Sequence, residues 1–194
     1  MLNKTANYIA KRLLNNQIIK EDSYDIYVYG LELLISFIFS TLLVIAIGAI
    51  IGRILETITF LIVFIFLRSY SGGYHAKKYY VCTIVTLCVY ISTILLSLFV
   101  QTNLIMYAIL GIVGLTLLIM WAPIENPNKE ITQRKRKKYK FISIVLFVAF
   151  LASGIILYYF YPYISNTVFF SLCADILLMF PDKLKKGEKI NVIL

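Results

Sequence analysis

Charged residues are scarce in this sequence. Asp, Glu, Lys and Arg make up 15% of its 194 residues, whereas soluble domains carry about 25%. Hydrophobic residues make up 60%, the mean hydropathy is +0.83, and no large polar domain interrupts the apolar runs. This composition excludes an ordinary soluble protein. It predicts an integral membrane protein whose main solvent is the bilayer.

Histidine and cysteine are also sparse, with one histidine, His75, and three cysteines, Cys82, Cys88 and Cys173. The cysteines form neither a CxxC pair nor a metal-ligand spacing, so we expect no metal and no cofactor. Disulfides are not expected for thiols in or near the cytosol. The net charge of +9 does not indicate nucleic-acid binding, because the basic residues form short clusters between apolar runs, as membrane topology requires.

Six apolar runs are candidates to cross the membrane as helices, for which about 20 residues are needed. They are 29–51, 54–67, 79–100, 104–121, 141–161 and 164–180. Only helices satisfy the backbone in lipid without closing a barrel. The sequence therefore predicts an all-α, polytopic membrane bundle of about six transmembrane helices. We expect one integral membrane domain over 1–194, with its transmembrane bundle at 29–180.

Basic residues are concentrated in alternate connections between these runs. The basic stretches are 1–28, 68–78, 129–140 and 181–194, whereas 101–103 and 158–163 carry no charge. Arg53 is the single exception to this alternation. The positive-inside rule then predicts that both termini are cytoplasmic, with 181–194 as a basic cytoplasmic tail, in a multi-pass membrane protein.

The N-terminal segment, 1–22, has a different pattern. Its apolar residues recur at helical spacing between polar ones: Leu2, Ala6, Ile9, Leu13 and Leu14. This pattern predicts an amphipathic interfacial helix on the inner leaflet. Two roles remain open for it, as a surface anchor or as a docking site for a partner helix.

Three carboxylates lie within the apolar runs, where each charge is costly. Glu32 lies in the first run, Glu56 in the second and Asp175 in the last. Asp175 either links to a Ser, Thr or Tyr on another helix or orients His75, and Glu32 is a further candidate for support. In an alternative function, the three carboxylates form the polar path of a membrane transporter for a peptide or an ion.

The stretch SGGYHAKKYYVC at 71–82 brings His75 and Cys82 within seven residues. By depth, Cys82 alone lies at the level of His75, so Cys88 and Cys173 are expected to be packing residues. A cysteine beside an imidazole can become a thiolate and attack a carbonyl carbon. The alternative is a boundary histidine near a core cysteine, because such pairs occur often by chance.

Helix geometry restricts how this pair could act. On one straight helix, seven residues separate the two side chains by about 10.5 Å along the axis. We therefore predict that the third helix begins after His75 or that the chain bends there, a turn that Gly72 and Gly73 permit. The second run, 54–67, is short and is expected to stop below the interface.

The stretch RSYSGGYHAKKYYVC at 68–82 resembles the motif of the accessory gene regulator B (AgrB) family of Gram-positive bacteria, which are membrane cysteine endopeptidases of quorum sensing. The matching residues are Arg68, Gly72, Gly73, His75 and Cys82. The segment APIENPNKEI at 122–131 resembles a second family segment. The resemblance implies His75 and Cys82 as the catalytic pair at the cytoplasmic face, supported by Arg68, Gly72 and Gly73.

The resemblance also implies the substrate, a signal propeptide with an amphipathic leader and an acidic tail. The enzyme would remove that tail through a Cys82 thioester, and the propeptide would then close a thiolactone ring. Basic residues could hold the acidic tail or instead bind anionic membrane lipids: Lys129, Arg134, Lys135, Arg136, Lys137 and Lys138. Gly111 and Gly114 could pack against a second copy in a homodimer. A non-catalytic scaffold is the third hypothesis.

Overall fold

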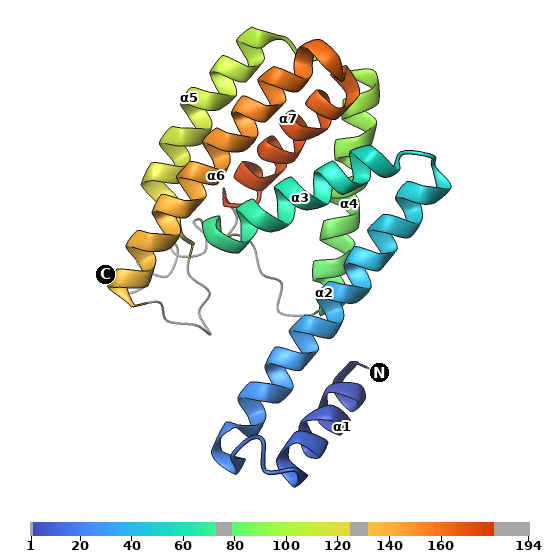
Figure 1. The fold of residues 1–194 in the computed structure, drawn as a ribbon, viewed down its shortest axis with the longest axis vertical. Helices are drawn as coiled ribbons and strands as arrows, with labels where there is room; N and C mark the ends of the chain where they lie inside the picture. The colour runs from blue at the N-terminus through green and yellow to red at the C-terminus, as the bar shows by residue number, and fades with distance from the viewer. Residues whose placement is uncertain (1, 73–78, 125–131, 181–194) are drawn as a thin grey trace, which may run out of the picture.

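The computed structural model describes residues 2–72, 79–124 and 132–180 and contains only helices within these ranges (Figure 1). The tail at 181–194 lies outside them. The elements are α1 (Leu2–Asn15), a short 3-10 helix η1 (Glu21–Ser23), α2 (Tyr24–Ile50), α3 (Ile54–Ser71), α4 (Tyr79–Phe99), α5 (Leu104–Trp121), α6 (Gln133–Phe160) and α7 (Pro162–Leu177). The predicted all-helical fold is confirmed for the described residues.

Five helices within the described ranges, α2 to α6, are long and apolar enough to cross a membrane. The sixth candidate, α7, has 16 residues, which corresponds to about 24 Å of helix. It packs against α3, α4, α5 and α6, between the long helices in Figure 1. A multi-pass membrane protein therefore fits this structure, while the number of spans and the side of the termini stay predictions.

Several helix ends differ from the predicted boundaries, two of them near the candidate site. The second run was expected to end at residue 67, but α3 continues to Ser71 and has 18 residues. The fifth was expected to begin at residue 141, but α6 begins at Gln133. A search for apolar runs does not detect polar helical turns, whether Arg68, Ser69 and Ser71 of α3 or the Gln, Arg and Lys residues of α6, which are good helix formers. The expectation that the second helix is short is therefore wrong, and the basic cluster forms the first turns of α6.

The N-terminal helix α1 packs along the first half of α2, away from the other helices (Figure 1). Ala6 and Ala10 are fully buried in this contact, and the side-chain amide of Asn3 donates a 2.6 Å hydrogen bond to Oε1 of Glu32. The predicted amphipathic helix is present but ends at Asn15. Its buried face covers α2 of the same chain.

A buried amide fixes α7 at the end of the bundle opposite to the end of α3. Oδ1 of Asn166 accepts a 2.6 Å hydrogen bond from the Thr102 hydroxyl, and its Nδ2 donates to the carbonyls of Ser97 and Val100, each at 3.1 Å. In a low-dielectric interior, such satisfied polar groups specify one arrangement of the helices. The register of α7 against α4 and α5, and with it the depth of Asp175, is set here.

Candidate active site

Cys82 lies about one turn into α4 and is half-buried. The adjacent residue, Thr83, fixes this part of α4, because its hydroxyl lies 2.8 Å from the Ser40 hydroxyl on α2. Ser40 in turn donates a 2.9 Å hydrogen bond to the carbonyl of Ser36. The rotation of α4 about its axis is therefore restrained beside Cys82.

The other two cysteines have different surroundings. Cys173 is partly buried against the apolar core cluster, so its predicted packing role is confirmed. Cys88 lies six residues beyond Cys82 on α4, and its side chain is exposed. The packing prediction for Cys88 is wrong, because this side of α4 is covered by no other described helix.

The proposed partner of Cys82 falls in one of the gaps between the described ranges. His75 and Gly73 lie outside the described residues, and so does Lys129. The described part of α4 begins at Tyr79, so the prediction that the helix starts or bends after His75 is not tested. The pairing of His75 with Cys82 stays a prediction.

The end of α3 makes close backbone contact with the segment after α5. The backbone N–H of Ile124 donates a 2.9 Å hydrogen bond to the carbonyl of Ser71. Gly72 follows with φ +74° and ψ −162°, a region that is essentially restricted to glycine. A Cβ added at Gly72 would collide with the backbone oxygen of Ile124. We call Ser71, Gly72 and Ile124 the α3–α5 joint.

Arg68 and Asp175 are the charged groups of the bundle at this end of α3 and α7. The guanidinium carbon of Arg68 lies 5.5 Å from the centre of the Phe64 ring, a cation–π arrangement. Asp175 is 2% exposed, and neither of its carboxylate oxygens accepts a hydrogen bond from the described residues. Arg68 is close enough for its charge to act on this carboxylate, although no ion pair joins the two side chains. The link to a Ser, Thr or Tyr that was predicted for Asp175 is therefore not found among the described residues.

The remaining two membrane carboxylates interact with residues near them. Glu32 is held by Asn3 of α1 and lies eight residues, or about 12 Å, before Ser40 along α2. Glu56, in the first turn of α3, pairs at 3.1 Å with Arg53, which directly precedes this helix. These contacts account locally for both carboxylates. They do not favour the alternative of a transport path.

The first turns of α6 carry the basic cluster. Its described members are all exposed: Arg134, Lys135, Arg136, Lys137 and Lys138. Tyr139 follows them and makes an edge-to-face contact with Tyr70 on the last turn of α3, with ring centres 5.7 Å apart. The cluster is thereby tied to the end of α3 that precedes the joint.

The described motif residues thus lie at helix ends, and those of α3 and α6 are in contact. Arg68 and the joint lie at the end of α3, Cys82 at the start of α4, and the basic turns at the start of α6. The family described as Accessory gene regulator B matches residues 2–180 of this chain. The chain belongs to the accessory gene regulator B family.

Individual relatives agree with this assignment. AgrB-like protein 2 of Clostridium perfringens (strain 13) is 30% identical over 172 residues, which cover 82% of this chain and 79% of that protein. Accessory gene regulator protein B of Staphylococcus saprophyticus is 28% identical over 129 residues, covering 66% and 68%. No solved structure matches this chain. The family assignment supports a role in accessory gene regulator quorum-sensing peptide processing.

The sequence of this AgrB family member did not reveal the contact between its two motif segments. The resemblance marked 68–82 and 122–131 separately, and the structure joins them through Ile124 and Ser71. A helix-breaking Ala-Pro pair after α5 signals a turn. It does not say which of the other helix ends that turn contacts.

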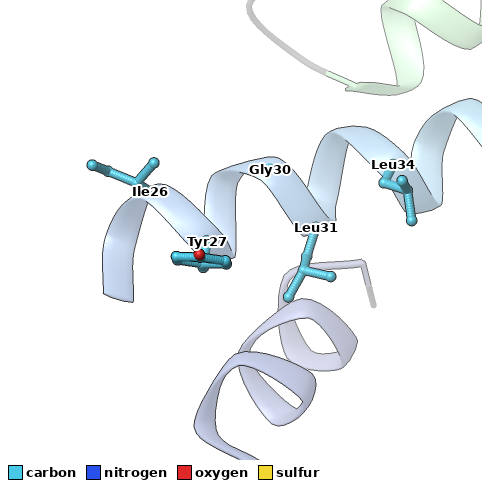
Figure 2. Close-up of a pocket in the computed structure, with 5 residues that line it drawn as sticks. All are labelled: Ile26, Tyr27, Gly30, Leu31 and Leu34. Carbon is cyan, nitrogen blue, oxygen red and sulfur yellow. The ribbon is translucent and has the colours of Figure 1, made fainter. Parts of the chain in front are cut away.

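No candidate metal centre appears among the described residues. They contain no group of three or more His, Cys, Asp or Glu side chains that could hold a metal ion. Figure 2 shows a shallow hollow on α2. It is lined by Ile26, Tyr27, Gly30, Leu31 and Leu34. Its lining is almost entirely apolar and offers no nucleophile, so it fits the outer surface of a membrane helix rather than a reaction site.

Proposed function

We propose that this chain is a membrane cysteine endopeptidase and cyclase that acts on a quorum-sensing propeptide. The observation that best supports this proposal is the position of Cys82. Its thiol is half-buried near the start of α4, beside the Ser40–Thr83 contact with α2. A partly accessible thiol at a helix start is the type of cysteine that can react, whereas a fully buried one is inert.

The first half of the proposed reaction forms an acyl-enzyme. His75 accepts the proton from the Cys82 thiol, and the thiolate attacks the carbonyl carbon at the end of the signal segment. The carbon–nitrogen bond then breaks, and the tail leaves as an amine that takes the proton from His75. The signal segment remains on Sγ of Cys82 as a thioester, at the cytoplasmic end of the bundle.

The second half closes the ring. The propeptide's own cysteine thiol attacks the thioester carbonyl, the carbon–sulfur bond to Sγ of Cys82 breaks as the new thioester forms, and the proton of the attacking thiol passes to Cys82. Thioester exchange is nearly neutral in energy, so the high effective concentration of an intramolecular thiol lets it compete with water. Shielding at the membrane surface would slow hydrolysis of the intermediate.

The exposed basic turns of α6 support the choice of substrate. Five cationic side chains lie within the first two turns of this helix, and Lys129 precedes them in the chain. Complementary charge would attract an acidic propeptide tail and raise the rate of encounter. The neighbouring Tyr70–Tyr139 contact keeps this basic surface next to the end of α3.

Substitution of the proposed pair in proteoliposomes tests this function. Cys82→Ser and His75→Ala are each expected to abolish cleavage of the propeptide, by a factor of at least about 10³, because either change removes the activated nucleophile. Cys88→Ser is the matched control on the same helix and should retain activity. Normal cleavage by both variants would contradict the proposal.

A further inference from the structure

The N-terminal helix α1 uses its small apolar face inside the chain. Ala6 and Ala10 are fully buried where α1 packs along α2, because small side chains let two helix backbones approach closely. The hydroxyl of Tyr24 donates a 3.1 Å hydrogen bond to Oδ1 of Asn7 and fastens the same contact. This face of α1 is therefore occupied by α2 and is not available to lipid chains.

The opposite face of α1 is basic and aromatic. Lys4, Tyr8, Lys11 and Arg12 are all exposed, and at 3.6 residues per turn they fall within an arc of about 100° on the side away from the buried alanines. The guanidinium carbon of Arg12 lies 5.2 Å from the centre of the Tyr8 ring, which is a cation–π arrangement. We call these four residues the basic face of α1.

The charge of the basic face is not balanced within its own segment. Residues 1–20 contain no Asp or Glu, and among the described residues no ion pair involves a cation of this face. Glu21 and Asp25 line a hollow together with Lys11, but the other two cations do not border it. The face therefore presents net positive charge, which attracts anionic partners.

The length of α2 places α1 near a membrane boundary. α2 has 27 residues, or about 40 Å of helix, whereas the hydrocarbon core of a bilayer is about 30 Å thick. The half of α2 that lies beside α1 (Figure 1) exposes Ile26, Leu34 and Phe37, with exposed fractions of 71%, 54% and 51%. These apolar side chains need lipid around them, while the excess length carries the end of α2 into the headgroup layer. Its companion helix α1 lies at the same level.

Phosphate groups of lipids lie at this level, and the basic face suits them. Lysine and arginine extend their charged ends toward headgroups, and tyrosine is enriched at the same depth. We propose that the basic face of α1 binds the phosphate groups of anionic phospholipids, so that α1 connects α2 to the membrane surface. An amphipathic anchor inserts its apolar face, whereas in this chain α2 covers that face and the charged face makes the contact. The proposal is independent of the His75–Cys82 pair.

A lipid fits this part of the molecule better than an acidic peptide does. The apolar hollow on α2, lined by residues such as Ile26 and Leu34, lies on the same half of that helix as α1 (Figure 2). A phospholipid carries both an acyl chain for this apolar surface and a phosphate for the basic face. An acidic peptide offers only the negative charge.

Fluorescence quenching by brominated phospholipids tests the contact in the full chain. The reporter is Tyr8→Trp, in a Trp121→Phe background that removes the only native tryptophan. The chain is placed in liposomes of equal parts phosphatidylglycerol and phosphatidylcholine, with one or the other lipid brominated. Brominated phosphatidylglycerol should quench roughly twice as strongly as brominated phosphatidylcholine, because the cations enrich the anionic lipid around α1. This excess should disappear in 1 M salt, where the screening length is about 3 Å.

Two triple variants of the reporter chain show whether the effect is local to α1. Gln in place of Lys4, Lys11 and Arg12 should abolish the excess quenching by phosphatidylglycerol and leave the quenching by phosphatidylcholine. The matched variant removes three charges from α6 and should keep the excess. Its positions are Lys135, Lys137 and Lys138.

A second reporter controls for the lipid mixture itself. Phe160 is 72% exposed in the turn between α6 and α7, where residues 158–163 carry no charge. Phe160→Trp in the Trp121→Phe background should therefore be quenched equally by the two brominated lipids.

The outcomes decide between a lipid and other partners. Equal quenching by the two lipids at the α1 reporter would overturn the proposal, and so would an excess that survives the loss of the three α1 cations or the addition of salt. Loss of the excess in the α6 variant to the same extent would show a general charge effect and would also overturn it. Absence of quenching by either lipid would place α1 in water, where an acidic peptide would be the better partner, and would contradict the lipid contact.

Discussion

At the scale of single residues, polar contacts between helices define the site more than apolar packing does. The Ser40–Thr83 contact orients α4 beside Cys82, and the backbone of Ile124 meets that of Ser71. Satisfied polar contacts of this kind are directional, whereas apolar packing tolerates rotation. Small residues such as Gly72 and Ser71 let the backbones approach. Arg68 and Asp175 place two charged side chains at the same end.

An interaction between Arg68 and Asp175 can be tested by a double-mutant cycle. If the charge of Arg68 acts on the Asp175 carboxylate, Asp175→Asn should lower the free energy of unfolding in detergent by about 1 kcal/mol, because it removes the group that the guanidinium stabilises. The same change combined with Arg68→Met should cost less than the sum of the two single changes.

The control for this cycle is Asp22→Asn, which neutralises an exposed carboxylate and should change the free energy by less than about 0.5 kcal/mol. Thermal unfolding followed by circular dichroism gives the change in free energy for Asp175→Asn, Arg68→Met, the double variant and Asp22→Asn. Strictly additive effects of the Arg68 and Asp175 substitutions would show that the two groups do not interact.

At the scale of elements, the apolar runs predicted the helices well but placed some of their ends wrongly. Five runs correspond to α2 to α6, because a bilayer span leaves a long, continuous signal. The polar last turn of α3 and the basic first turns of α6 were missed, since their helical structure depends on propensity and on neighbours such as Tyr70 and Tyr139. These polar turns carry Arg68 and the basic cluster of the candidate site, whereas Cys82 lies in the predicted run 79–100.

The basic turns of α6 have a separate, measurable consequence. Replacing Lys135, Lys137 and Lys138 together by Gln should raise KM for a propeptide with an acidic tail by roughly tenfold and leave kcat nearly unchanged, because the charges act on encounter and binding. The activity of this variant should also depend less on salt.

A matched variant removes the same number of charges elsewhere. Lys4, Lys11 and Lys20 are exposed near the N-terminus, and their replacement by Gln should leave KM within about twofold if tail binding is local to α6. Equal increases in KM for the two triple variants would indicate instead that the membrane surface as a whole attracts the propeptide.

At the scale of the whole molecule, the sequence predicted the class of fold, while the assembly of the site required the structure. Hydropathy predicted a multi-pass helical bundle, and the motif at 68–82 indicated the family that the comparison over 2–180 established. The meeting of residues 71 and 124 was not predictable, because it depends on how α3 and α5 pack through α6 and α7. The cytoplasmic position of both termini follows from charge alternation and stays a prediction.

The acyl-enzyme itself provides the most direct test of the proposed function. A synthetic propeptide whose own cysteine is replaced by alanine cannot close the ring, so the intermediate should accumulate when it is mixed with the purified chain. Mass spectrometry should then find the propeptide minus its tail attached to Cys82 and released by hydroxylamine, with no adduct in Cys82→Ser. Release of the tail without an adduct on Cys82, or an adduct on Cys88 or Cys173 instead, would contradict the proposed mechanism.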